Sequence, residues 1–268
     1  MTPLRGLGGA VLALPLVAAL FARWWFPGDP REPSGRPFLP PGGAGHLLGT
    51  DDLGRDLLAA LAHGGQASLL TSAVVTIVAA LIGVVLGVVA GSAAPLADRL
   101  IVRLMDLSQI VPRFFLALLA TAWLGPGWFQ LAIILALTGW ATLARLVRAE
   151  ARALRQAPFI EAARLLGASP ASIALRHIVP NVMPLVLPQL PLVFASALLI
   201  EAGLCFLGAG DPNRLSWGQL IQSGQSHALR AWWLAFFPGL TLAFASLGLS
   251  LLALGAPGSQ NEAALGAG

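Results

Sequence analysis

Six long apolar stretches alternate along the chain with short polar or proline-rich segments. An apolar run of about 20 residues can cross the roughly 30 Å hydrocarbon layer of a membrane as a helix that rises 1.5 Å per residue. The pattern therefore predicts an all-α membrane protein with six transmembrane helices. The expected spans are Leu7–Phe26, Leu69–Val89, Leu104–Leu124, Trp128–Leu146, Leu185–Leu207 and Trp232–Leu254.

Glycine and proline indicate how these spans are built. Gly83, Gly87 and Gly91 lie four residues apart in the second span, a spacing that lets two helix backbones approach closely in lipid. Pro112 interrupts the third span, and further prolines at the start of the fifth predict a kink or break there. These further prolines are Pro184, Pro188 and Pro191.

The connection between the first two spans has two parts. Pro27–Gly45 is rich in proline and glycine, which predicts an irregular loop. Leu47–His63 predicts an amphipathic helix on the membrane surface, with Thr50 or Asp51 as its N-cap. Arg55 can then pair with an aspartate one turn back. The apolar stripe of this helix would consist of Leu53, Leu57 and Leu61.

Aromatic residues indicate where the chain meets the membrane surface. The first span ends in Arg23–Phe26, which is typical of an interfacial anchor, so we expect a retained helix and not a cleaved signal. Trp232 begins the sixth span in the same way. In the connection that precedes it, we expect Trp217, Leu220 and Ile221 to lie along the interface.

The segment Phe159–Pro184 predicts two short helices joined by a hinge. Gly167 fits the left-handed residue that ends a helix, and Ser169 suits the N-cap of the next one. Pro180 and Pro184 are expected to stop that second helix. The small apolar face of the first helix consists of Phe159, Ala162, Ala163 and Leu166. A compact two-helix segment of this kind between apolar spans is suited to binding another protein.

Composition narrows the class of protein. The 268 residues are 57% hydrophobic and 10% charged, and the mean hydropathy is +0.79, whereas a soluble domain carries about 25% charged residues. All 16 basic residues are arginine. A GxxxxGK[ST] loop needs its lysine, so the chain cannot supply an ATPase site of that type.

The arginines cluster at segment ends, which favours membrane orientation over nucleic-acid binding. They are most concentrated in the connection between the fourth and fifth spans, and arginine-rich short connections face the cytoplasm. We therefore expect a multi-pass protein with both termini cytoplasmic. The arginines in and beside this connection are Arg145, Arg148, Arg152, Arg155, Arg164 and Arg176.

The sequence shows no cluster of the kind that binds metals or performs catalysis. Its four histidines are scattered without HxxxH spacing, and its one cysteine, Cys205, has no histidine cluster beside it. A GxSxG elbow is also missing. We therefore expect no catalytic, cofactor-binding or metal-binding residue in this chain. The histidines are His46, His63, His177 and His227.

Three segments carry a resemblance to a known family. Glu161-Ala162-Ala163, followed by Gly167 and Pro180, resembles the EAA loop of binding-protein-dependent ABC importer permeases. Glu201–Gly208 resembles the EAxLSFLGLG stretch of the same family. A third segment resembles the GTDxxGRD signature of the second permease in dipeptide, oligopeptide and nickel importers. Its signature residues are Gly49, Thr50, Asp51, Asp52, Gly54, Arg55 and Asp56.

The resemblance implies a type I ABC importer permease fold with a cytoplasmic coupling helix, in a bacterial inner membrane. It implies pairing with a homologous second permease, two cytoplasmic ABC ATPases that bind ATP and magnesium, and an extracytoplasmic solute-binding protein. It implies no nucleic-acid partner. The residues implied to couple to the ATPases are Phe159, Glu161, Ala162, Ala163, Arg164 and the hinge Gly167.

Three ionisable residues inside predicted spans are candidates for the translocation pathway. An ionised side chain there costs about 2.5 kcal/mol or more, and it usually faces a cavity or a partner. Arg113 either pairs with Asp106, two turns back, or snorkels to an interface, or it meets an anionic group of the cargo. Glu201 either has a structural or gating role or contacts the cargo.

The implied cargo is a di- or oligopeptide, with nickel or a metal–chelate complex as the alternative. A secondary carrier coupled to ions, or a channel, is the alternative of another class, and vanadate-sensitive uptake that depends on a binding protein would separate the two classes. We expect three regions along the chain. They are 1–45, a transmembrane helix with a periplasmic loop, 46–254, the permease domain, and 255–268, a disordered cytoplasmic tail.

Overall fold

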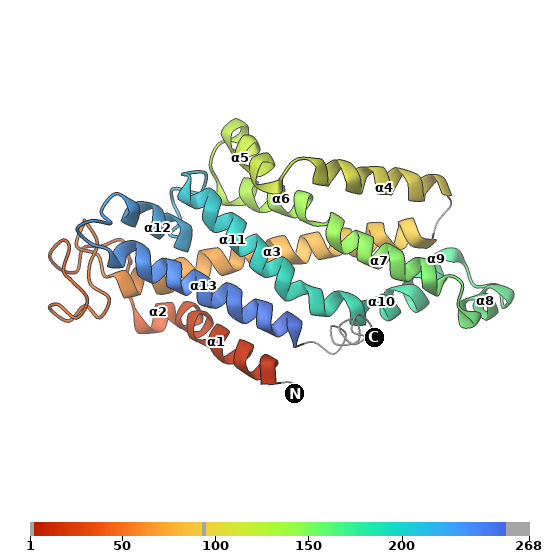
Figure 1. The fold of residues 1–268 in the computed structure, drawn as a ribbon, viewed down its shortest axis with the longest axis horizontal. Helices are drawn as coiled ribbons and strands as arrows, with labels where there is room; N and C mark the ends of the chain where they lie inside the picture. The colour runs from red at the N-terminus through yellow and green to blue at the C-terminus, as the bar shows by residue number, and fades with distance from the viewer. Residues whose placement is uncertain (1–2, 93–94, 256–268) are drawn as a thin grey trace, which may run out of the picture.

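The computed structural model describes residues 3–92 and 95–255, and within these ranges it is a bundle of helices without a β-sheet (Figure 1). Five helices are long and apolar enough to cross a membrane, or six if the bent pair α4 and α5 forms one span. The helices are α1 Pro3–Leu20, α2 Ala22–Trp25, α3 Leu57–Ser92, α4 Pro95–Ile110, α5 Arg113–Leu124, α6 Trp128–Gly139, α7 Ala141–Leu154, α8 Pro158–Leu165, α9 Pro170–Ile173, α10 Val179–Val186, α11 Leu190–Phe206, α12 Trp217–Gln225 and α13 Trp233–Leu254.

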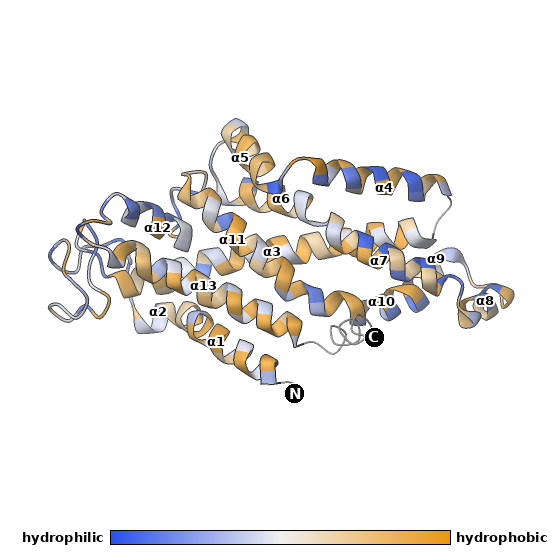
Figure 2. Ribbon diagram, in the orientation of Figure 1, coloured by the Kyte–Doolittle hydropathy of each residue, from blue (hydrophilic) through white to orange (hydrophobic). Residues whose placement is uncertain are grey.

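The long helices run between two ends of different character. At one end lie α12 and the irregular loop 26–56, and at the other end α8 projects from the bundle (Figure 1). Helices α1, α3 and α13 are drawn mostly in the colours of apolar residues, whereas α4, α7, the loop and the segment around α8 are mixed (Figure 2). A helix satisfies its own backbone hydrogen bonds, so it can be surrounded by lipid. The predicted all-α membrane fold is confirmed.

Helix α3 is central to the bundle and packs against α1, α6, α7, α11 and α12. Its glycine face packs on α7 and consists of Gly83, Gly87 and Gly91. A Cβ atom added to Gly87 would lie 2.7 Å from the Cβ of Val147, and one added to Gly91 would lie 2.7 Å from the Cβ of Ala151. Only glycine permits this approach, because a real Cβ atom cannot come so near another. The spacing of the glycines therefore predicted a real contact.

The surface helix predicted over Leu47–His63 is wrong. Helix α3 begins only at Leu57, where the Asp56 side chain accepts a hydrogen bond from the N–H of Ala59 at 2.9 Å. Upstream, the carboxylate of Asp51 accepts hydrogen bonds from the N–H groups of Leu53 and Arg55 at 2.9 and 2.8 Å. This local bonding competes with a helix and turns the chain. From Leu57, α3 continues into the second span without a break.

The third predicted span bends at its proline. Helices α4 and α5 meet at an angle of 80° on either side of Val111 and Pro112. Proline lacks an N–H, and its ring clashes with the carbonyl one turn back. These two effects of Pro112 explain the sharp bend. As a result, residues before and after Pro112 do not share one helical face.

The prediction that Pro180 and Pro184 stop a helix is also wrong. Pro170–Phe206 forms one continuous helical run that contains both prolines. The run changes register through a π-helical turn at Ala174–Ile178 and a 3-10 turn at Leu187–Gln189. Such turns absorb a missing donor without ending the helix, and a helical run keeps the backbone satisfied in lipid.

Trp217 and Leu220 of α12 pack into the bundle and do not lie along an interface as predicted. The side chain of Trp217 is 1% exposed, and its Nε1–H donates to the carbonyl of Leu61 at 2.9 Å. Leu220 is buried in the same apolar cluster. Gly218 brings α12 against α11, because a Cβ added there would lie 2.8 Å from the Cβ of Cys205.

The glycine face of α3 can be tested with the substitution Gly87→Ala. The added methyl group meets Val147 and the carbonyl of Ala144, so overpacking should lower the stability by about 1–3 kcal/mol. The measurement is the thermal unfolding midpoint of the purified protein in detergent. Gly239→Ala in α13 is the matched control, because nothing lies within 4 Å of its added Cβ. Equal midpoints for the two variants would contradict the packing.

Candidate functional site

Helix α8 forms, with its flanking turns, a knob (residues 155–169) that projects from one end of the bundle (Figure 1). Pro158 occupies the first turn of α8. Gly167 ends the helix with a φ of +81°, and its N–H donates to the carbonyl of Arg164 at 3.0 Å. The hydroxyl of Ser169 accepts from the N–H of Ser172 at 3.2 Å and caps α9. The predicted first helix, its glycine end and the Ser169 cap are thus present, whereas the second helix continues in one helical run to Phe206.

Ile160 anchors the knob to the bundle. Its side chain is fully buried in an apolar cluster with Val147 of α7 and Ile173 of α9. Ala163, one turn later in α8, packs at the edge of this cluster. The predicted apolar face missed Ile160, although its spacing of three residues from Ala163 is a helical spacing that could have found it.

The opposite side of α8 is exposed and apolar at its end. Leu165 is 85% and Leu166 is 88% exposed, and Phe159 is 45% exposed. Glu161, Ala162 and Arg164 are exposed as well. These side chains give the knob an apolar surface beside its charged residues. The shallow cleft beside them is lined by Arg152, Arg155, Gln156, Glu161, Arg164 and Leu165.

Two helical rods carry the knob. The first rod, Trp128–Leu154, comprises α6 and α7 and leads into it, and the second rod, Pro170–Phe206, leads out of it. Helix α4 is tied to the first rod by a bidentate ion pair between Arg148 and Asp98. A displacement of the knob therefore acts on two long helical segments and on α4.

The three candidate pathway residues do not form one cluster. Asp106 pairs with Arg145, whose Nη2 lies 2.6 Å from Asp106 Oδ1, so the predicted Asp106–Arg113 pair is wrong. The bend at Pro112 separates the two residues, since the residue spacing of a straight helix no longer applies there.

Arg113 begins α5 and points into the bundle. Its Nη1 lies 3.5 Å from the hydroxyl oxygen of Ser196, at the limit of a hydrogen bond. Its Nε and Nη2 are buried and have no acceptor among the described residues. A Cβ added to Gly139 would lie 2.8 Å from Nη2, so the guanidinium occupies space that this glycine leaves open.

Glu201 lies deeper, between α11, α3 and α12. Its side chain is 3% exposed, and its Oε1 lies 3.2 Å from the Sγ of Cys205. Its Oε2 has no hydrogen-bond partner in the described part of the chain. The hydroxyls of Ser68 and Ser216 face the same carboxyl group. Because these groups connect three helices, a structural role for Glu201 fits the geometry.

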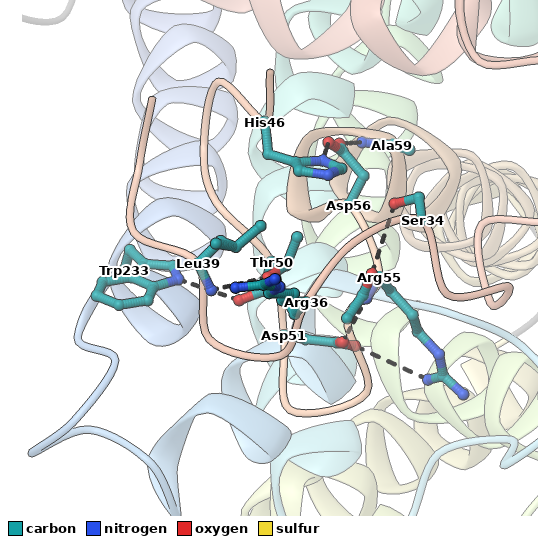
Figure 3. Close-up of polar contacts among 11 residues, drawn as sticks. Ser34, Arg36, Leu39, His46, Thr50, Asp51, Arg55, Asp56, Ala59 and Trp233 are labelled. Atoms are coloured by element: carbon teal, nitrogen blue, oxygen red, sulfur yellow. Dashed lines mark hydrogen bonds and ion pairs between the residues drawn. The ribbon is translucent and has the colours of Figure 1, made fainter. Parts of the chain in front are cut away.

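The GTDxxGRD segment belongs to the irregular loop at the other end of the bundle (Figure 1) and forms a compact turn there (Figure 3). Thr50 is fully buried; its Oγ1 accepts from the N–H of Leu39 at 2.9 Å and donates to the carbonyl of Arg36 at 2.6 Å. Gly49 and Gly54 both have positive φ, at +83° and +78°, and a side chain on either would meet the neighbouring loop backbone. The conformation therefore requires glycine at these two positions.

Charged side chains of the segment close the turn onto its surroundings. His46 Nδ1 lies 2.6 Å from Asp56 Oδ2, and His227 Nε2 lies 3.7 Å from Asp52 Oδ2. Burial raises the pKa of Asp51, and the N–H groups of Arg55 and Leu53 oppose that rise. The segment thus fastens the loop to α3 and to the start of α13, where Trp233 Nε1–H donates to the carbonyl of Thr50 at 3.3 Å.

Within residues 3–92 and 95–255, no three His, Cys, Asp or Glu side chains gather in a way that could hold a metal ion.

Comparison with known proteins identifies relatives of the whole bundle. Residues 83–257 match the family model described as the inner membrane component of binding-protein-dependent transport systems. The chain is 38% identical, over 92% of its length and 84% of the relative's, to the di/tripeptide transport system permease protein DppC of Pseudomonas aeruginosa. It is 41% identical, over 73% of its length and 65% of the relative's, to the oligopeptide transport system permease protein OppC of Salmonella typhimurium.

A solved structure shares the fold. The structure titled as inward facing conformations of the MetNI methionine ABC transporter superposes with a TM-score of 0.59 and 18% sequence identity. The match covers 72% of this chain and 93% of that chain. At this identity the likeness concerns the fold alone.

The role of Thr50 can be tested with the substitution Thr50→Val. Valine keeps the shape but leaves the Leu39 N–H and the Arg36 carbonyl without their partner, which should cost about 1–3 kcal/mol. We expect faster proteolytic cleavage within residues 27–49 of the purified protein. Thr50→Ser, which keeps the hydroxyl, is the control and should resist cleavage like the wild type. Equal resistance of the valine variant would show that the hydroxyl does not hold the loop.

Proposed function

The chain belongs to the family of inner membrane components of binding-protein-dependent transport systems, and from this premise we propose that it is the permease subunit of an ATP-driven ABC importer for di- and oligopeptides. The observation that carries the proposal is the knob, with Leu165 and Leu166 exposed on one side of α8 and Ile160 buried on the other. The peptide cargo is supported by the names of the two relatives.

The chain is a multi-pass membrane protein, and the proposal adds its orientation. We propose a bacterial inner membrane with both termini in the cytoplasm. The arginines of the first rod and the knob support this orientation, since arginine-rich connections stay on the cytoplasmic side. The regions would be 1–45, 46–254 and 255–268, the last of which lies, apart from Gly255, outside the described residues.

The partners follow from this orientation. Two cytoplasmic ABC ATPases bind ATP and magnesium, a second homologous permease completes the membrane unit, and a solute-binding protein delivers the cargo from outside. The chain itself is not catalytic. It performs a mechanical task, which is to convert movement of the ATPases into movement of the spans.

The coupling step uses the geometry of the knob. Leu165, Leu166 and Phe159 provide the apolar contact with an ATPase, while Glu161 and Arg164 provide charges beside it. Ala162 is exposed and small and permits close approach, and Ala163 packs toward Ile160. When the ATPases close, the knob moves, and both rods move with it because Ile160 is packed between them. The pathway then opens alternately to either side.

Among the proposed pathway residues, Arg113 has the strongest support. Asp106 pairs with Arg145, and Glu201 is enclosed by α3, α11 and α12. Neither Arg113 nor Glu201 has an ionic partner within the described ranges, and of these two it is Arg113 that lies between the two rods. Asp106 and Glu201 would therefore shape the helices that border the pathway.

The experiment that tests the function is uptake into vesicles that contain the permease pair and the ATPases. We expect vanadate-sensitive uptake of a labelled dipeptide only when the solute-binding protein is present. Uptake that proceeds without ATPase subunits would instead indicate a secondary carrier or a channel.

The contact surface is tested with Leu165→Asp. Burying a leucine side chain contributes about 1.5–3 kcal/mol to the free energy of association. This change should therefore lower the amount of ATPase that co-purifies with the permease by about tenfold or more. Leu229→Asp is the matched control, since Leu229 is fully exposed at the other end of the bundle. The surface is wrongly assigned if both variants retain the ATPases equally.

The hinge is tested with Gly167→Val. Gly167 has a φ of +81°, and a β-branched residue in this region is strained by about 1–3 kcal/mol, so the knob should tilt or loosen. We expect peptide uptake to fall by about tenfold while ATP hydrolysis by the assembled complex continues. Gly125→Val is the control, because Gly125 has a φ of +82° with open space around it and lies outside the knob. Normal coupling in Gly167→Val would count against the hinge.

A further inference from the structure

Arg113 lies where two interrupted helices meet. It is the first residue of α5, directly after the 80° bend. Its Nη2 lies against Gly139, the last residue of α6, and Trp140 separates α6 from α7. A charged side chain therefore occupies the one place where both α4–α5 and the first rod lose helical continuity.

The same guanidinium lies between the two rods that carry the knob. Gly139 belongs to the first rod and Ser196, whose hydroxyl is 3.5 Å from Nη1, belongs to the second. The knob joins the far ends of these rods. Any movement of the knob that changes the separation of the rods also changes the walls around Arg113.

The charge of Arg113 has no counter-ion among the described residues. The two acids of α4 pair elsewhere, Asp106 with Arg145 and Asp98 with Arg148. Glu201 of α11 forms no ion pair with Arg113, and its Oε1 lies 3.2 Å from the Sγ of Cys205. Arginine does not lose its proton in proteins, so the guanidinium stays charged within a membrane span. A charge of this kind usually faces a partner or a water-filled path. An anion brought by another molecule would supply the partner that the described residues lack.

We propose that Arg113 recognises the free carboxylate of the peptide cargo during transport, an inference that rests on the proposed function. The planar guanidinium offers paired N–H donors that match the two oxygens of a carboxylate. Nε and Nη2 are buried in the present conformation, so pairing belongs to the conformation in which the rods have separated. Arg113 is then a specificity residue that favours peptides ending in a free carboxylate over peptides that end in an amide.

The test compares uptake of a dipeptide and its C-terminal amide by reconstituted vesicles, at concentrations that load the solute-binding protein to equal occupancy. We expect the wild type to transport the acid about tenfold faster than the amide, as one charge-assisted contact would give. In Arg113→Gln the ratio should fall to near one, chiefly through slower transport of the acid. Arg103→Gln, which removes an exposed arginine from α4, is the matched control and should keep the wild-type ratio.

The remaining outcomes overturn the proposal in distinguishable ways. Equal transport of acid and amide by the wild type, or both rates of Arg113→Gln remaining at their wild-type values, contradicts the role of Arg113 and leaves the importer intact. A fall in both rates by the same factor assigns the counter-ion to an acid of the paired permease instead. Absence of vanadate-sensitive uptake of either peptide removes the proposed function together with the inference.

A second variant covers the case in which Arg113→Gln does not assemble. Arg113→Lys keeps the charge but not the paired donors, so we expect the complex to assemble. Its acid-to-amide uptake ratio should lie between the wild-type ratio and one. A ratio equal to that of the wild type would show that the paired donors do not recognise the carboxylate.

Discussion

The close packing of α3 against α7 holds the helix that leads directly into the knob. The glycine face of α3 brings the two backbones together, and Val147 and Ala151 fill the space that the missing side chains leave. In lipid there is little hydrophobic drive for helices to associate, so close van der Waals contact of this kind supplies the cohesion. A knob attached to a loosely held helix would move without moving the bundle. We propose that the packing of α3 on α7 transmits movement of the knob to the bundle.

The ion pairs and the helix breaks divide the bundle into stiff and deformable parts. Near the knob, Asp98 and Asp106 of α4 pair with arginines of α7, so α4 and α7 form one block. Further along, this block ends at Pro112 and at Trp140. Arg113 lies at that boundary, where a rotation of the block would change the contacts of its side chain. Mechanical coupling and recognition of a charge thus meet at one residue.

Much of the fold could be predicted from local pattern, because the spans, the glycine spacing and the helix end at Gly167 depend on neighbouring residues. The failures share another cause. The signature at Gly49–Asp56 has the composition of a capped helix, but the side chain of Asp51 bonds its own backbone and the loop supplies Thr50 with partners from residues far away in the sequence. The burial of Trp217 and the pairing of Asp106 with Arg145 likewise depend on tertiary contacts that periodicity does not contain.

The central claim is that the knob faces the cytoplasm and is covered there by an ATPase. It can be measured by labelling a Leu165→Cys variant, in a Cys205→Ser background that removes the one native cysteine, with a maleimide that cannot cross membranes. The account predicts labelling in inverted membrane vesicles but not in intact spheroplasts, and protection when ATPase subunits are added to the vesicles. Labelling of the intact spheroplasts from outside, or labelling that the ATPase subunits do not slow, would contradict it.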